Sequence, residues 1–310
     1  MGDSCVVALD VGGTRIKAGI VDPGADGGAR VLADRVADTG REDGPDAVAD
    51  RLLNLLDEMV GTSRELGRTP VAAGVAMPGI VEETTGTVVF SANVGWRDFP
   101  LGEHLAKWSG LPTAVGHDVR AGGLAELELG AGRGARDMLF LPIGTGIAGA
   151  MILDGRPYTG GGYAGEIGHM QVDPAGEPCG CGGRGCLETV ASAAAIARRY
   201  AERRVNCGPI GAADVARLAA DREPLAEEIW RRAVDGLATA LHAYVSICAP
   251  RLIVVGGGLA ECGEVLLAPV RTALAARLTF QRRPDIVRAG LGDRAGLLGA
   301  ALLAWQRVSA

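Results

Sequence analysis

Lysine and aromatic residues are scarce in this sequence, and long runs of basic or of apolar residues are missing. Lysine occurs only at Lys17 and Lys107, and the net charge is −6 at pH 7. No block of basic residues is longer than two or three, so we expect neither a nucleic-acid interface nor a patch for an anionic membrane surface. No run of about 18 apolar residues occurs, so we expect no transmembrane helix.

Aromatic residues make up only 4 % of the chain, so Val, Leu, Ile and Ala must form the core. Glycine, at 48 of 310 residues, has about twice its usual share. The glycines gather in short runs such as Gly256–Gly258, which indicates tight turns and ligand-binding loops. A chain of this length is expected to form about two domains.

The first residues lack a basic segment followed by an apolar one, and Asp10 comes too early for an export signal. We therefore expect a cytoplasmic protein. The seven cysteines are not expected to form a disulfide framework in a reducing compartment. Cys179, Cys181 and Cys186 lie close together in the sequence, and this clustering suggests a metal site instead.

Strand and helix patterns alternate along the chain, which predicts an α/β fold with sheets covered by helices. A strand, a Gly/Thr turn and a second strand begin both halves, at 5–22 and again at 137–153, which suggests two related halves with a boundary near 118–130. Expected strands are 5–10, 15–22, about 30–36, 71–76, 113–117, 137–143, 147–153 and 251–255. Expected helices are 46–60, 102–109, 119–129, 189–205, 212–220, 225–248, 264–278 and 294–307. The first of these places the apolar side chains of Val48, Leu52, Leu55, Leu56 and Met59 on one stripe.

The D-V-G-G-T-R motif at 10–15 suits a phosphate group. Gly12 and Gly13 let the backbone approach the phosphate oxygens, and the hydroxyl of Thr14 and the guanidinium of Arg15 are suitable donors. Asp10 could act on Mg²⁺ through water. An ordinary glycine hairpin turn is the alternative.

The G-T-G-I-A-G motif at 144–149 matches a dinucleotide fingerprint, but a strand pattern follows it where that fingerprint requires a helix. We therefore interpret Gly144, Thr145 and Gly146 as a second phosphate turn. Gly256–Gly258 follows the strand at 251–255, and glycine at a strand end permits close approach of a ligand. The adenosine of a nucleotide is one candidate there, and a plain turn is the other.

The strongest motif joins G-E-I-G-H at 165–169 to C-G-C-G-G-R-G-C-L-E at 179–188. His169, Cys179, Cys181 and Cys186 form a Cys₃His set, which suits tetrahedral zinc with no open position. The spacing of the first two cysteines is C-x-C and not the redox motif C-x-x-C. Unrelated buried thiols are a further alternative. We expect a structural zinc ion that fixes the loop.

These motifs together resemble the ROK family (repressor, open reading frame, kinase), and within it the bacterial glucokinases. The resemblance spans nearly the whole chain. It rests on DVGGTRIKAGIVD at 10–22, GVAMPGIV at 74–81, SANVGW at 91–96, the Asp118 segment, PIGTGIAGA at 142–150, the zinc segment and IVVGGG at 253–258.

The resemblance implies two actin-like (ribonuclease H-like) α/β domains with a cleft between them. The small domain would cover 1–118, and the large domain, with the zinc loop, 119–293. A C-terminal helix at about 294–310 would pack back on the small domain. The resemblance also implies a homodimer whose partners are a sugar and ATP. The sugar-responsive repressors of the family carry an N-terminal DNA-binding extension, for which no room is expected here.

The resemblance implies an ATP-dependent kinase that phosphorylates the 6-hydroxyl of glucose or a close hexose, with Mg²⁺ and structural zinc. Asp118 would be the general base, although a lone aspartate after a strand is more often a helix N-cap. Implied sugar contacts are Gly79, Asn93, His117, Asp118, Glu166, His169 and Glu188. Implied nucleotide contacts are Asp10, Gly12, Gly13, Thr14, Arg15, Gly144, Thr145, Gly146, Gly257 and Gly258. His169 would bind zinc with one ring nitrogen and the sugar with the other.

One departure from the family pattern concerns specificity. Family glucokinases usually read E-N-D-A-N around the base, whereas this chain has Gly116, His117, Asp118, Val119 and Arg120. The change is either tolerated variation or a sign of another sugar, such as 3-amino-3-deoxyglucose, glucosamine or N-acetylmannosamine, because a polar site discriminates by its hydrogen bonds. Polyphosphate stays an alternative phosphate donor.

Overall fold

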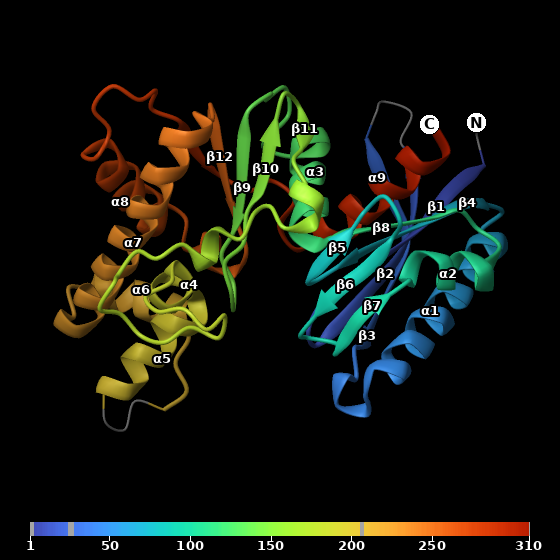
Figure 1. Cartoon of the computed structure of the whole chain (residues 1–310), viewed down its shortest axis with the longest axis horizontal. Helices are drawn as coiled ribbons and strands as arrows, with labels where there is room; N and C mark the ends of the chain where they lie inside the picture. The colour runs from blue at the N-terminus through green and yellow to red at the C-terminus, as the bar shows by residue number, and fades with distance from the viewer. Residues whose placement is uncertain (1–2, 24–27, 205–207, 310) are drawn as a thin grey trace. The chain divides into compact units, whose positions relative to one another are not determined.

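The computed structural model describes residues 3–23, 28–204 and 208–309, and its chain forms two compact units (Figure 1). The first unit comprises Met1–Gly130, Pro157–Ala164 and Asp293–Ala310, and the second comprises Ala131–Arg156 and Gly165–Gly292. The domain boundary expected at 118 stays a prediction, and the first compact unit continues to Gly130. None of the helices in the described parts of the chain combines the length and the apolar character that a membrane crossing needs.

The first unit is built on a five-stranded sheet with the order β3-β2-β1-β4-β8. The β1, β2 and β3 strands are antiparallel neighbours, whereas β4 and β8 run parallel to β1. The carboxyl ends of β1, β4 and β8 therefore lie at one edge of the sheet. The strands are β1 (Ser4–Val11), β2 (Arg15–Pro23), β3 (Ala29–Asp38), β4 (Thr69–Met77) and β8 (Thr113–His117).

Helices cover both faces of this sheet. On α1 (Pro45–Glu65) the predicted apolar stripe is confirmed, with Leu52 and Leu56 fully buried in one core with Val7 and Leu9 of β1. The other face is covered by α9 (Ala295–Ser309), which lies so close to β4 that a Cβ at Gly74 would meet a carbonyl oxygen of α9 at 1.9 Å. The remaining helical segments are α2 (Leu101–Ser109), α3 (Asp118–Leu129), η1 (Arg41–Asp43), η2 (Gly160–Gly162) and η5 (Gly292–Arg294).

A small three-stranded sheet of the first unit, β5-β6-β7, was not expected from the sequence. Its strands are β5 (Ile80–Glu82), β6 (Thr87–Ser91) and β7 (Trp96–Phe99), which are too short to give a clear alternating pattern. The Trp96 and Phe99 rings stack with centroids 4.5 Å apart, and the Trp96 indole donates to the carbonyl oxygen at the first residue of α1. These contacts fasten the small sheet to the helix layer.

The second unit repeats the same sheet order, β11-β10-β9-β12-β13. Again β10 is antiparallel to the central strand β9, and β12 and β13 run parallel. The predicted α/β class with two related halves is thereby confirmed. The strands are β9 (Met138–Pro142), β10 (Ala150–Leu153), β11 (Arg156–Pro157), β12 (Leu252–Gly256) and β13 (Asp285–Arg288).

The helices of the second unit surround α7, whose apolar residues form the centre of its core. They are α4 (Leu187–Ala191), α5 (Ala193–Arg203), α6 (Ala212–Ala220), α7 (Pro224–Cys248) and α8 (Glu264–Ala275), with η3 (Ile167–His169) and η4 (Gly258–Cys262).

Two expected elements of the second unit need correction. The single helix expected at 189–205 is two helices, because Ser192 is extended (φ −67°, ψ 155°) and its hydroxyl caps α5 by accepting from the Ala195 N–H at 3.1 Å. The strand expected at 147–153 begins only at Ala150, because the Gly149 N–H donates to the Gly165 carbonyl and not to a strand.

Candidate functional site

Four predicted site residues lie at or directly after the carboxyl ends of the parallel strands of the first unit. Asp10 pairs with Ala76 across β1 and β4, and His117 pairs with Met77 across β8 and β4. Gly79 follows β4 by two residues, and Asp118 follows β8 directly. One sheet edge therefore collects these groups, where ligands commonly bind in open α/β sheets.

The predicted phosphate turn of the first unit connects β1 to β2. The Gly12 N–H donates to the Arg15 carbonyl at 2.8 Å, and Thr39 from the end of β3 braces the turn by donating from its hydroxyl to the Gly12 carbonyl at 2.7 Å. Thr14 and Arg15 are exposed, and a Cβ at Gly13 would meet nothing within 4 Å. Donor side chains and open backbone therefore face solvent, as a phosphate turn requires.

The carboxylate of Asp10 lies against the first turn of α9. A Cβ at Gly296 would lie 2.5 Å from Asp10 Oδ2, so this approach depends on the glycine. Burial, together with the charge of Asp118, raises the pKa of Asp10 to about 6, although Lys17 opposes the rise. Lys17 is itself anchored, because its Nζ donates to the Asp293 carbonyl at 2.6 Å.

Asp118 is the first residue of α3, and His117 takes the N-cap position. The alternative in which Asp118 is the N-cap is therefore wrong, because the chain is still extended at His117 (φ −70°, ψ 135°) and the helix begins at Asp118. Asp118 Oδ1 accepts from the Val119 N–H at 2.7 Å and lies 3.3 Å from His117 Nε2. Burial raises the pKa of Asp118 to about 6, while the Val119 N–H and the Arg120 charge oppose the rise. A carboxylate with a pKa in this range has the basicity that general-base catalysis near neutral pH requires.

The other two sugar-site candidates of the first unit are close to each other along the small sheet. Gly79 has φ 116°, which disfavours any side chain, and a Cβ there would lie 2.2 Å from the Phe90 carbonyl oxygen. Asn93 is exposed in the turn between β6 and β7. The glycine thus lets the chain after β4 pass directly against the strand that leads to Asn93.

The two predicted nucleotide turns of the second unit lie side by side, because they follow the neighbouring parallel strands β9 and β12. Gly257 has φ 73°, and a Cβ there would lie 2.5 Å from the Ile143 carbonyl oxygen. A Cβ at Gly144 or at Gly258 would meet nothing within 4 Å, and Thr145 is exposed. Both turns therefore present open backbone on one side of the second unit.

Glu188 connects helix α4 to the first of these turns. Its Oε2 accepts from the Ile147 N–H at 2.9 Å, and a Cβ at Gly146 would lie 2.4 Å from the same oxygen. The break before α5 reaches the same turn, since the Ala193 N–H donates to the Gly144 carbonyl at 2.8 Å. The implied sugar residue Glu188 is thus held beside the glycine turn.

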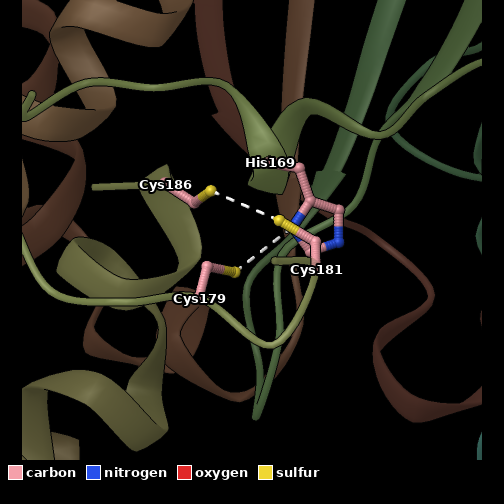
Figure 2. Close-up of side chains that lie close together, drawn as sticks. All are labelled: His169, Cys179, Cys181 and Cys186. Atoms are coloured by element: carbon pink, nitrogen blue, oxygen red, sulfur yellow. Dashed lines mark hydrogen bonds between the residues drawn. The ribbon is translucent and has the colours of Figure 1, made fainter. Parts of the chain in front are cut away.

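The predicted metal ligands come together as one cluster, drawn in Figure 2. The ligand atoms of His169, Cys179, Cys181 and Cys186 all lie within 4.8 Å of one another. Cys179 Sγ lies 3.6 Å from His169 Nδ1, and Cys181 Sγ lies 3.7 Å from Cys186 Sγ. Tetrahedral zinc would place two sulfurs about 3.8 Å apart and a sulfur and a nitrogen about 3.6 Å apart. The residues therefore fit structural zinc.

The zinc loop holds His169 in a defined orientation. His169 Nδ1 faces the sulfurs, which leaves Nε2 on the other side, 3.8 Å from Glu166 Oε2. The loop is tied to α5 through Glu177, which accepts hydrogen bonds from Arg199 at 2.6 Å and from Arg198 at 2.5 Å. These two arginines lower the pKa of Glu177 although its burial opposes them. A metal in this cluster would thus fix the ring that carries the free nitrogen.

The sequence did not reveal a buried ion pair beside the candidate base Asp118. Arg120 is 3 % exposed, and its Nε donates to Glu83 Oε1 at 2.6 Å. The Lys17–Asp293 pair was not revealed either. The sequence contained hints of both pairs. Lys17 is one of only two lysines, and Arg120 lies two residues after the candidate base, inside an expected helix.

The predicted site residues fall into two sets, and each set lies within one unit. Asp10, Gly12, Gly13, Thr14, Arg15, Gly79, Asn93, His117 and Asp118 belong to the first unit. Gly144, Thr145, Gly146, Glu166, His169, Cys179, Cys181, Cys186, Glu188, Gly257 and Gly258 belong to the second.

Comparisons with known proteins agree with these features. The model of the ROK family matches residues 6–307. A glucokinase from Thermotoga maritima is 33 % identical over 98 % of this chain and 98 % of its own length. The crystal structure of a ROK hexokinase from Thermus thermophilus is 35 % identical and covers 98 % of this chain and 99 % of its own, with a TM-score of 0.83.

A third relative was solved with ligands. The structure of a ROK family glucokinase from Streptomyces griseus in complex with glucose and AMPPNP is 30 % identical, covers 97 % of this chain and 99 % of its own, and has a TM-score of 0.81. The family also includes transcriptional regulators. With its two actin-like sheets and its Cys₃His cluster, the chain belongs to the ROK family and is similar to the glucokinases within it.

Proposed function

We propose that this protein is a sugar kinase that transfers the γ-phosphoryl group of ATP to the 6-hydroxyl of glucose or a close hexose. The observation that carries the proposal is the sheet edge of the first unit, where Asp118, with its raised pKa, and the Gly12–Arg15 turn follow parallel strands. Similarity to the glucokinase solved with glucose and AMPPNP supports the same function.

Asp118 is the proposed base. As the sugar oxygen forms its bond to the γ-phosphorus, its proton moves to the Asp118 carboxylate, and the bond to the ADP oxygen breaks. The pKa near 6 leaves the carboxylate ionised at pH 7.5 and still basic enough to accept the proton.

The glycine turns are the proposed phosphate and nucleoside contacts. Backbone N–H groups at these turns stabilise the charge on the phosphoryl oxygens. Asp10 would hold Mg²⁺ through water, and Lys17 favours the ionised form of Asp10 that this role requires. The zinc cluster has a structural role in the proposal, because four protein ligands leave no position open for substrate.

An amino-sugar kinase is the alternative, and it rests on His117. The ring of His117 is buried, with 7 % of the residue exposed, and its Nε2 faces Asp118. This orientation favours glucose, because the ring nitrogen that distinguishes this chain is directed to the base. The homodimer and the cytoplasmic location stay predictions.

A coupled assay of ADP release across glucose, mannose, 3-amino-3-deoxyglucose, glucosamine and N-acetylmannosamine tests the proposal. We expect glucose to have the highest kcat/KM with ATP, and polyphosphate to be a poor donor. Asp118→Asn should reduce kcat by at least about 10²-fold, while Asp50→Asn, an exposed change on α1, should leave it unaltered. Turnover retained in Asp118→Asn would remove the proposed base, and an amino sugar preferred by 100-fold would establish the alternative.

A further inference from the structure

His117 and Asp118 form a pair that the family pattern E-N-D-A-N does not contain. His117 ends β8 and is buried, whereas 31 % of the Asp118 side chain is exposed. His117 Nε2 lies 3.3 Å from Asp118 Oδ1, and the Val119 N–H donates to the same oxygen at 2.7 Å. Both neighbours therefore approach Oδ1, and neither of these two contacts involves Oδ2.

The backbone that carries this pair is held by a buried network. The His117 N–H donates to Glu83 Oε1 at 3.3 Å, and the same oxygen accepts from Arg120 Nε at 2.6 Å. The Arg120 guanidinium also donates to the carbonyl oxygens of Gly162 and Ala164, each at 3.3 Å. Because Arg120 is fixed on several sides, the turn from β8 into α3 has little freedom to move.

A ring nitrogen can lie close to a carboxylate oxygen only as a donor, because two acceptors repel each other. We propose, on the basis of the kinase function above, that His117 is a positioning residue whose Nε2–H, with the Val119 N–H, holds Asp118 Oδ1 and leaves Oδ2 to accept the sugar proton. His117 then acts through the base and not on the sugar.

The charged groups around the pair set its pH dependence. Asp10 at the end of β1 and Glu83 after β5 are acidic, and Arg120 on α3 is basic, while the adjoining parts of β4 and α9 contribute apolar side chains. Arg120 is paired with Glu83, so the His117 ring N–H is the main donor available to the Asp118 carboxylate besides the Val119 N–H. Losing this donor destabilises ionised Asp118 and raises its pKa.

Two substitutions separate positioning from sugar recognition. His117→Phe keeps a ring of similar size and removes the donor, whereas His117→Gln places an amide N–H near the position of Nε2. We expect His117→Phe to reduce kcat with glucose about 10- to 100-fold, as a misplaced catalytic group does, with KM for glucose within about 3-fold. We expect the acid limb of its kcat/KM profile to move to higher pH, and His117→Gln to restore kcat and the wild-type limb.

The competing role makes a different set of predictions. If His117 binds the sugar, both variants raise KM for glucose and change the preference among hexoses and amino sugars, while the acid limb stays in place. That result overturns the proposal. A His117→Gln variant as slow as His117→Phe, with both folded, overturns it as well.

A readout without catalysis tests the hydrogen bond directly. Imidazole ¹⁵N chemical shifts of the zinc-loaded protein at pH 8, assigned by the signals lost in His117→Gln, should show the Nε2–H tautomer for His117. The Nδ1–H tautomer contradicts the proposal. Failure of the proposed kinase function and failure of the His117 proposal give different results. Loss of turnover in Asp118→Asn with normal turnover in His117→Phe supports Asp118 as the base and overturns only the role of His117.

Discussion

The ionised carboxylate of Asp118, the proposed base, promotes the reaction but lowers the free energy of unfolding. Burial raises the pKa of Asp118 from its ordinary 3.8 to about 6. Ionised Asp118 is therefore less stable in the folded chain than in the unfolded chain. We expect Asp118→Asn to increase the free energy of unfolding at pH 7.5 by about 1–2 kcal/mol. The amide removes the charge and keeps an oxygen that can accept from the Val119 N–H.

The magnitude follows from linkage between protonation and folding. A rise of about 2 in pKa corresponds to about 3 kcal/mol at a pH above both values. Because 31 % of the Asp118 side chain is exposed, solvent screening reduces this to about 1–2 kcal/mol. The folded pKa lies above the unfolded one, so the stability of the wild type falls as pH rises from about 3.8 through about 6. Asp118→Asn has no ionisable group at this position, so its stability lacks this decrease with rising pH.

Urea unfolding at several pH values, with zinc concentration fixed, measures the difference. The gain of Asp118→Asn over the wild type should be full at pH 7.5 and shrink by about half at pH 5. Asp50→Asn is the matched control and should show no gain. An Asp118→Asn protein that is no more stable at pH 7.5, or whose gain is the same at pH 5, would refute the reasoning.

Three further predictions concern the zinc cluster and two glycines. Cys186→Ser should lower zinc content measured by atomic absorption and lower the midpoint of thermal unfolding, since structural zinc contributes folding energy; full occupancy would argue against a Cys₃His site. Gly296→Ala should displace Asp10, since a Cβ would lie 2.5 Å from its carboxylate, and we expect kcat to fall about 10-fold or more at a higher Mg²⁺ requirement. Gly146→Ala should displace Glu188, whose carboxylate would lie 2.4 Å from the new Cβ; isothermal titration should show weaker binding of a non-hydrolysable ATP analogue, and unaltered binding would contradict the assignment of this turn.

Much of the fold could be predicted from local patterns in the sequence. The α6 helix has the predicted bounds, and the apolar stripe of α1 is buried as expected, because periodicity directly reports a buried face. The small sheet could not be predicted, because its strands are three to five residues long. The break at Ser192 depends on the turn that it contacts, and no local signal near Ser192 reveals that contact.

The candidate site divides in the same way. The Cys₃His cluster was predictable, because four ligand types in a short segment restrict the possible metals. The His117–Asp118 contact and the Gly296 approach were not predictable, because both depend on where strand ends and helix α9 meet in space. Motifs thus identified the residues, whereas the orientation of each carboxylate needed the fold.

The shared strand order of the two sheets is what duplication of an ancestral unit would leave behind. In both units the central strand leads through a glycine turn into an antiparallel partner. Aligning Gly12–Thr14 with Gly144–Gly146 sets Asp10 opposite Pro142, so only one copy kept an acidic group at this point. In the proposed kinase this difference assigns the two turns different tasks: the first has a carboxylate beside it for a cation, whereas the second offers only backbone N–H groups to an anion.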